Sequence, residues 1–66
     1  MTERNLLVRV DGKGGEGASS LLIYRVGSQL EFVVTEEKAG DAACFIPEQD
    51  ALKALESVVA LTRGSK

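Results

Sequence analysis

Few side chains in this sequence could carry out catalysis. The chain contains no histidine, a single cysteine, Cys44, and a single tyrosine, Tyr24. Acid–base and nucleophilic catalysis require positioned acids, bases or activated nucleophiles, and Cys44 lies between Ala43 and Phe45 with no histidine in the chain to activate its thiol. We therefore expect a protein that is not an enzyme, in which Cys44 packs as a small apolar side chain.

Two stretches could hold an ion, and neither has the spacing of a known site. The glycine-rich segment 12–17 follows a strand pattern, but it lacks the GxxxxGK[ST] and GxGxxG spacings and leads into another strand instead of a helix. The acidic residues Glu36, Glu37 and Asp41 lack the DxDxDG spacing of a calcium loop. The sequence therefore predicts a mobile loop, a solvated acidic turn, and neither cofactor nor metal.

One aromatic side chain is expected to lie among charged residues. Strand alternation places Tyr24 near Arg9 and Glu31 on one face of a sheet. An aromatic ring flanked by arginine can hold single-stranded nucleic acid by stacking and charge. The alternative places Tyr24 at a seam between two chains, with its hydroxyl in water.

Four segments have the patterns of strands. Residues 5–11 alternate, so that Leu6, Val8 and Val10 should share a face, and residues 42–46 form a short apolar run. Residues 21–34 predict a hairpin whose two-residue turn, Gly27-Ser28, places Val26 opposite Gln29 and fixes the register. The charged segment 35–41 predicts a turn. One face of this hairpin should carry a helix, namely Leu21, Ile23, Leu30, Phe32 and Val34.

A single helix is expected after these strands. Pro47 is tolerated in a first helical turn, and Glu48 and Asp50 place negative charge at its positive end, so the helix should run over residues 47–63 and end near Gly64. The fold class is therefore α+β, a four-stranded antiparallel sheet followed by one C-terminal helix (β-β-β-β-α), in a single domain spanning residues 1–66.

The chain has more apolar surface than its length can bury. It has 66 residues, near the lower limit for a self-sufficient core. Both faces of residues 21–34 and a wide arc of the helix are apolar, so we predict a homodimer. Its interface should contain Leu22, Tyr24, Val26, Val33, Val58 and Leu61. The N-terminus lacks the apolar run of a signal peptide or membrane span, so we expect a soluble, cytoplasmic protein with no membrane partner.

Residues 38–55, KAGDAACFIPEQDALKAL, resemble the C-terminal part of the PC4-like transcriptional coactivator family. There a Lys-x-Gly turn leads through a short last strand into a helix often opened by Pro-Glu-Gln. The resemblance implies the β-β-β-β-α order, a homodimer formed through helices and sheets, and single-stranded DNA bound on curved sheets. Asp50 stands where the family usually has an aromatic residue, and the strands carry only Arg9 and Arg25 in place of a basic lattice. The resemblance implies a nucleic-acid-binding role for Arg9, Tyr24 and Arg25, assisted by Lys13 and Lys38 in loops.

Two functions remain open at this point. The first is a homodimeric, single-stranded nucleic-acid-binding transcription cofactor of PC4 type. The second is a protein-interaction module, such as a small regulator or inhibitor that docks on a larger partner. The net charge of −2 opposes the first, because phosphate contacts supply most nucleic-acid affinity. The apolar second face favours the other.

Overall fold

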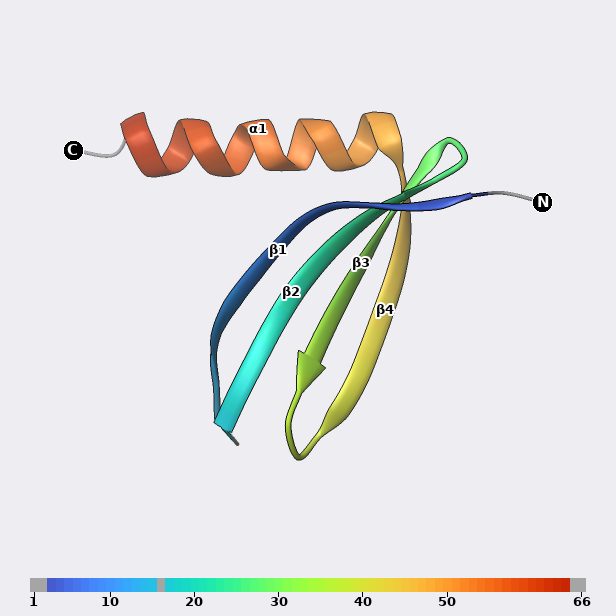
Figure 1. The fold of residues 1–66 in the computed structure, drawn as a ribbon. Helices are drawn as coiled ribbons and strands as arrows, with labels where there is room; N and C mark the ends of the chain where they lie inside the picture. The colour runs from blue at the N-terminus through green and yellow to red at the C-terminus, as the bar shows by residue number, and fades with distance from the viewer. Residues whose placement is uncertain (1–2, 16, 65–66) are drawn as a thin grey trace.

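The computed structural model describes residues 3–15 and 17–64 and shows a curved antiparallel sheet followed by one helix (Figure 1). The strands lie side by side in chain order. This arrangement confirms the predicted α+β class. The elements are β1 (Arg4–Gly14), β2 (Gly17–Val26), β3 (Gln29–Glu36), β4 (Gly40–Pro47) and α1 (Glu48–Gly64).

The β2–β3 hairpin has the register that its turn predicts. Val26 lies opposite Gln29, and the pairing continues without a shift to Ser19 opposite Glu36. Gly27 has φ of +63° and Ser28 does not have a positive φ, which is the pattern of a type II′ turn. Such a turn matches the right-handed twist of the two strands, so it sets the register of the centre of the sheet.

The glycine-rich segment extends the strands, and its prediction as a loop is wrong. Gly12 to Gly14 belong to β1 and Gly17 begins β2, while residue 16 lies outside the described residues. The side chain of Glu36, at the end of β3, lies against Gly14, and that of Glu37, in the β3–β4 turn, lies against Gly17. A Cβ at Gly17, where φ is +122°, would lie 2.8 Å from Glu37 Oε1. Glycine therefore lets two hairpins approach closely here.

A β-bulge in β1 changes which of its side chains share a face. Leu6 pairs with Tyr24 and Val8 with Ile23, so Leu7 is the extra residue. Leu6 consequently lies on the opposite face from Val8 and Val10, and the prediction that these three share a face is wrong. A bulge inserts one residue without changing the partner strand, and this reverses the alternation on one side of it.

The helix packs against one end of one sheet face, which we call the helix face. Ala51, 1% exposed, contacts Leu30, 3% exposed, and Ile23, with Phe32 and Ile46 beside them. Beyond this cluster the sheet curves away from α1 (Figure 1). Leu21 and Val34 lie on the same face but are exposed. The helix therefore covers only part of the face predicted to carry it.

The described chain is more extended than a compact protein of its length. Its Cα radius of gyration is 13.5 Å, whereas a compact chain of this length has about 11 Å. Its accessible area is 5219 Å², against about 4,000 Å² for a folded monomer of this mass. The chain therefore leaves about 1,200 Å² more of its surface accessible than a compact monomer of this mass would.

Candidate functional site

The sheet face opposite α1, which we call the outer face, carries a cluster of three stacked and paired side chains. Tyr24 and Glu31 are opposite one another on β2 and β3. Arg4 Nε donates to Glu31 Oε1 at 2.8 Å, and Arg4 Cζ lies 3.7 Å from the centroid of the Tyr24 ring. The hydrogen bond to Glu31 raises the pKa of Arg4. Glu31 is only 8% exposed, so Arg4 supplies the charge that compensates for its burial.

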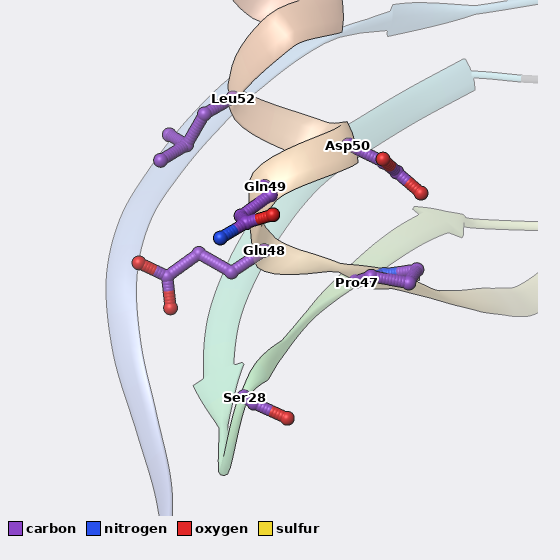
Figure 2. A pocket seen from close by; sticks show the side chains of 6 residues that line it. All are labelled: Ser28, Pro47, Glu48, Gln49, Asp50 and Leu52. Carbon is purple, nitrogen blue, oxygen red and sulfur yellow. The ribbon is translucent and has the colours of Figure 1, made fainter.

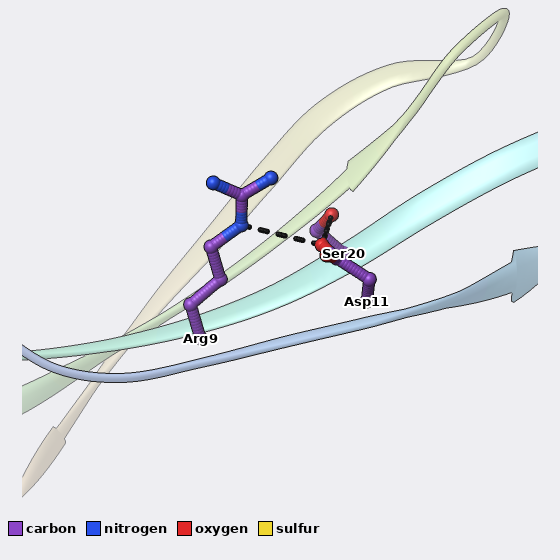
Figure 3. Close-up of polar contacts among 3 residues, drawn as sticks. All are labelled: Arg9, Asp11 and Ser20. Carbon is purple, nitrogen blue, oxygen red and sulfur yellow. Dashed lines mark hydrogen bonds and ion pairs between the residues drawn. The ribbon is translucent and has the colours of Figure 1, made fainter.

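A second polar cluster lies farther along the outer face (Figure 3). Asp11 Oδ1 accepts hydrogen bonds from Ser20 Oγ at 2.7 Å and from Arg9 Nε at 3.2 Å. These contacts lower the pKa of Asp11, the Ser20 hydrogen bond most and the Arg9 charge next. Asp11 therefore favours the folded state above its ordinary pKa of 3.8, and this contribution is lost as the pH falls through the lowered value.

Removing the Ser20 hydroxyl should raise the pKa of Asp11 towards its ordinary value. In Ser20→Ala the carboxylate loses its shortest hydrogen bond and keeps only Arg9. A carboxyl-detected NMR titration of both proteins would measure the shift. Ser19→Ala is the matched control, because Ser19 points to the other face and should leave the Asp11 titration unchanged. An unchanged pKa in Ser20→Ala would contradict this account.

The structure does not bring the five predicted nucleic-acid-binding residues together. Arg9, Lys13 and Tyr24 lie on the outer face, whereas Arg25 lies on the helix face, because neighbouring strand residues point to opposite sides. Arg25 Nη2 donates to Glu48 Oε2 at 3.2 Å. Lys38 lies in the turn between β3 and β4.

Arg4 is the residue that the sequence prediction missed. Arg4 and Arg9 would point to opposite faces of a regular strand, but the bulge at Leu7 places both on the outer face. Lys13 follows on that face by alternation. The basic side chains of β1 thus form a line along one edge of the outer face. A bulge has no marker in this sequence, so the line could not be recognised before the structure.

The predicted dimer-interface residues also divide between two surfaces. The sheet residues lie on the outer face, where Val33 is buried and the others are half-buried, namely Leu22, Tyr24 and Val26. Val58 and Leu61 lie on α1, with 59% and 74% of their surface exposed. Because α1 packs on the opposite side of the sheet, one flat contact could not cover both groups.

Exposed apolar side chains are instead concentrated around α1 and the helix face. The sheet contributes Val8, Val10, Leu21 and Val34. The helix contributes Leu52, Leu55, Val58, Val59 and Leu61. Only Ala51 of α1 is buried. The exposed apolar residues of α1 and of the helix face of the sheet are therefore two uncovered surfaces, and α1 and the far end of the sheet diverge from one another (Figure 1). We refer to these two surfaces together as the helix-face wedge.

A hollow of about 560 Å³ lies between the β2–β3 turn and the start of α1 (Figure 2). Its lining residues are Ser28, Pro47, Glu48, Gln49, Asp50 and Leu52. Glu48 N donates to Ser28 O at 3.0 Å and its carboxylate is paired with Arg25. The hollow is open and bordered by carboxylates, which disfavours an anionic ligand at this helix start.

The remaining candidate residues do not form a reactive centre. Cys44 is exposed, which corrects the prediction that it packs inside, because it lies on an edge strand beyond the reach of α1. Next to the glycine-rich segment, Glu37 Oε1 accepts a hydrogen bond from Ala18 N at 3.3 Å. A side-chain carboxylate therefore already occupies a backbone N–H that a bound anion would use. Residues 3–15 and 17–64 contain no group of three or more His, Cys, Asp or Glu that could hold a metal.

No helix in the described part of the chain has the length and apolar character needed to cross a membrane. Comparison with protein-family models, with curated proteins and with solved structures found no match to this chain.

Proposed function

We propose that this chain is a non-catalytic binding module that works as a homodimer. The observation that carries the proposal is the helix-face wedge, in which α1 beyond Ala51 exposes its apolar residues opposite an exposed apolar sheet surface. Each copy supplies both a helix wall and a sheet wall. A twofold dimer can therefore cover the helix of each copy with the sheet of the other, because isologous contacts use the same patch twice.

The size of the exposed surface supports a partner of this kind. The chain exposes 5219 Å², about 1,200 Å² more than a folded monomer of its mass. A stable interface buries about 800 Å² on each partner, and obligate dimers bury more. The wedge consists of aliphatic residues, and homodimer interfaces are more apolar than the rest of a protein surface.

Light scattering at micromolar concentration tests the proposal directly. We expect a native mass of at least twice the chain mass of 7.0 kDa. A mass of 7.0 kDa for the purified chain would contradict it.

A second candidate function is single-stranded nucleic-acid binding on the outer face, as in the PC4-like family. The bulge in β1 supports it, because it aligns Arg4 and Arg9 with Lys13 on the face that holds Tyr24. Cations spaced along an aromatic-bearing sheet suit a single strand. Asp11 and Glu31 on the same face already pair with two of these arginines, so we rank this function below protein binding.

Oligonucleotide binding to a Tyr24→Ala variant would test this second function. If bases stack on Tyr24, the variant should lose about 1–3 kcal/mol, or about 5- to 150-fold in affinity. Fluorescence anisotropy with a labelled oligothymidine at low salt would measure it. Arg25→Ala is the control, because Arg25 lies on the helix face and its loss should leave affinity unchanged. Equal affinity of Tyr24→Ala and the original chain would exclude stacking on this ring.

A further inference from the structure

The two edges of the sheet differ in how they are protected from pairing with another strand. β1 carries the bulge at Leu7 and the charged residues Arg9, Asp11 and Lys13. Bulges and charges are the usual means by which proteins prevent edge-to-edge association. β4 has no bulge, and Asp41 is its one charged residue. The residues of β4 from Gly40 to Phe45 are exposed. From the end of β4, α1 runs towards the β1 side of the sheet and so away from the β4 edge (Figure 1).

The backbone groups that β4 presents at this edge follow from its pairing with β3. Glu48 N donates to Ser28 O at 3.0 Å, so the backbone of Glu48 faces β3. In an antiparallel ladder the backbone groups of successive residues point to alternate sides. Asp41, Ala43, Phe45 and Pro47 therefore direct their backbone groups away from the sheet. Pro47 has no N–H, and an outward position on an edge strand is where proline is tolerated.

We infer that β4 pairs with β4 of a second copy, antiparallel, with Cys44 of each chain at the twofold axis. The outward backbone groups of Ala43 then meet those of Phe45 in the other chain. This register sets the bulky Phe45 beside the small Ala43 and leaves Asp41 opposite Pro47 at the end of the ladder. Centring the axis on Ala43 would instead place each Asp41 opposite a Phe45, where the carboxylate would lose water without a partner.

A second copy suits this edge because the edge is complementary to itself. Under the twofold axis no two like charges come opposite one another, since Asp41 is the only charged residue of β4. This pairing uses a surface separate from the helix-face wedge. It therefore goes beyond the proposed function, and joins two wedge dimers into a tetramer of four times the 7.0 kDa chain mass.

An Ala43→Lys variant tests the pairing. Lysine on the exposed edge would place two like charges near the twofold axis, and because Ala43 is exposed the longer side chain can extend into solvent. We expect light scattering to give half the native mass of the original chain, with an unchanged far-UV circular dichroism spectrum. Ala39→Lys is the matched control, because it adds the same charge in the turn outside β4 and should keep the original mass. Equal masses for the two variants would overturn the inference.

Cys44 provides a second measurement that needs no substitution. Residues facing one another without mutual hydrogen bonds have Cα atoms about 4.5 Å apart, and this separation is within the range of a disulfide. Diamide would accept two electrons and two protons as the two thiols form one disulfide. We expect a covalent dimer, linked through Cys44, to form within minutes, and no covalent dimer to form in Cys44→Ser. Cross-linking no faster than in Ala43→Lys would overturn the register.

The two interfaces can be told apart with one further variant. Val58→Lys, on the wedge, should leave the diamide cross-link intact, because β4 does not take part in the wedge. A Val58→Lys protein that still cross-links supports the edge pairing whatever the fate of the wedge dimer. Loss of the cross-link in Val58→Lys, with the helix still formed, would show that Cys44 meets its copy only through the wedge and would overturn the inference.

Discussion

Replacing Val58 by lysine should halve the native mass of the protein. Val58 is 59% exposed within the chain, so its loss should cost the isolated chain little, whereas the proposed dimer buries it. Truncating a well-packed interface residue costs about 2 kcal/mol or more, and a twofold interface contains the residue twice. We therefore expect dimer affinity at the wedge to fall about a thousandfold, as measured by sedimentation equilibrium.

Ala60→Lys is the control for this substitution. Residue 60 lies on the side of α1 opposite Ala51, because it comes nine residues later, and nine steps of about 100° leave the two positions about half a turn apart around the helix axis. Both variants add the same charge, and lysine is a good helix former in each. Ala60→Lys should keep the original mass. A Val58→Lys protein with the same mass as Ala60→Lys would mean that the wedge is not the interface.

Replacing Leu30 by alanine should cause the largest loss of folding stability in the chain. Leu30 is 3% exposed and joins Ala51 of the helix to Ile23 of the sheet. Removing a buried leucine side chain costs about 2–5 kcal/mol, which is a large part of the about 3–10 kcal/mol that stabilises a chain of this length. Thermal unfolding followed by circular dichroism should show a midpoint lower by about 10 °C or more.

Leu7→Ala provides the matched comparison for Leu30→Ala. The chemical change is the same, but Leu7 is the extra residue of the bulge and is 51% exposed. Its truncation should cost less than about 1 kcal/mol. If both variants unfold at similar temperatures, the small cluster around Leu30 is not what holds the helix to the sheet.

The centre of the fold could be predicted because local chemistry determines it. Gly27 supplies the positive φ that a two-residue turn needs, and this alone sets every β2–β3 pair. Pro47 and the acidic residues after it mark the change from strand to helix to within one residue. Alternation then assigns Ile23, Leu30 and Phe32 to the face that carries α1, as the structure confirms.

Other features depend on contacts between residues distant in the chain. The segment 12–17 contains four glycines, which predicts a loop, yet β1 continues to Gly14 and β2 begins at Gly17, where ladder pairing and the side chains of Glu36 and Glu37 hold the strands. Local backbone preference is weak for glycine, so tertiary contacts decide its conformation.

The candidate binding surfaces also depend on contacts between residues that are distant in the chain. Only the tertiary structure shows the bulge that brings Arg4 onto Tyr24, because one extra residue reverses the face of every residue before it and nothing in β1 marks its position. The sequence by itself determined that this chain has more apolar surface than it can bury. Which surface remains open was decided by the curvature of the sheet, which carries its far end away from α1 and leaves the helix-face wedge exposed.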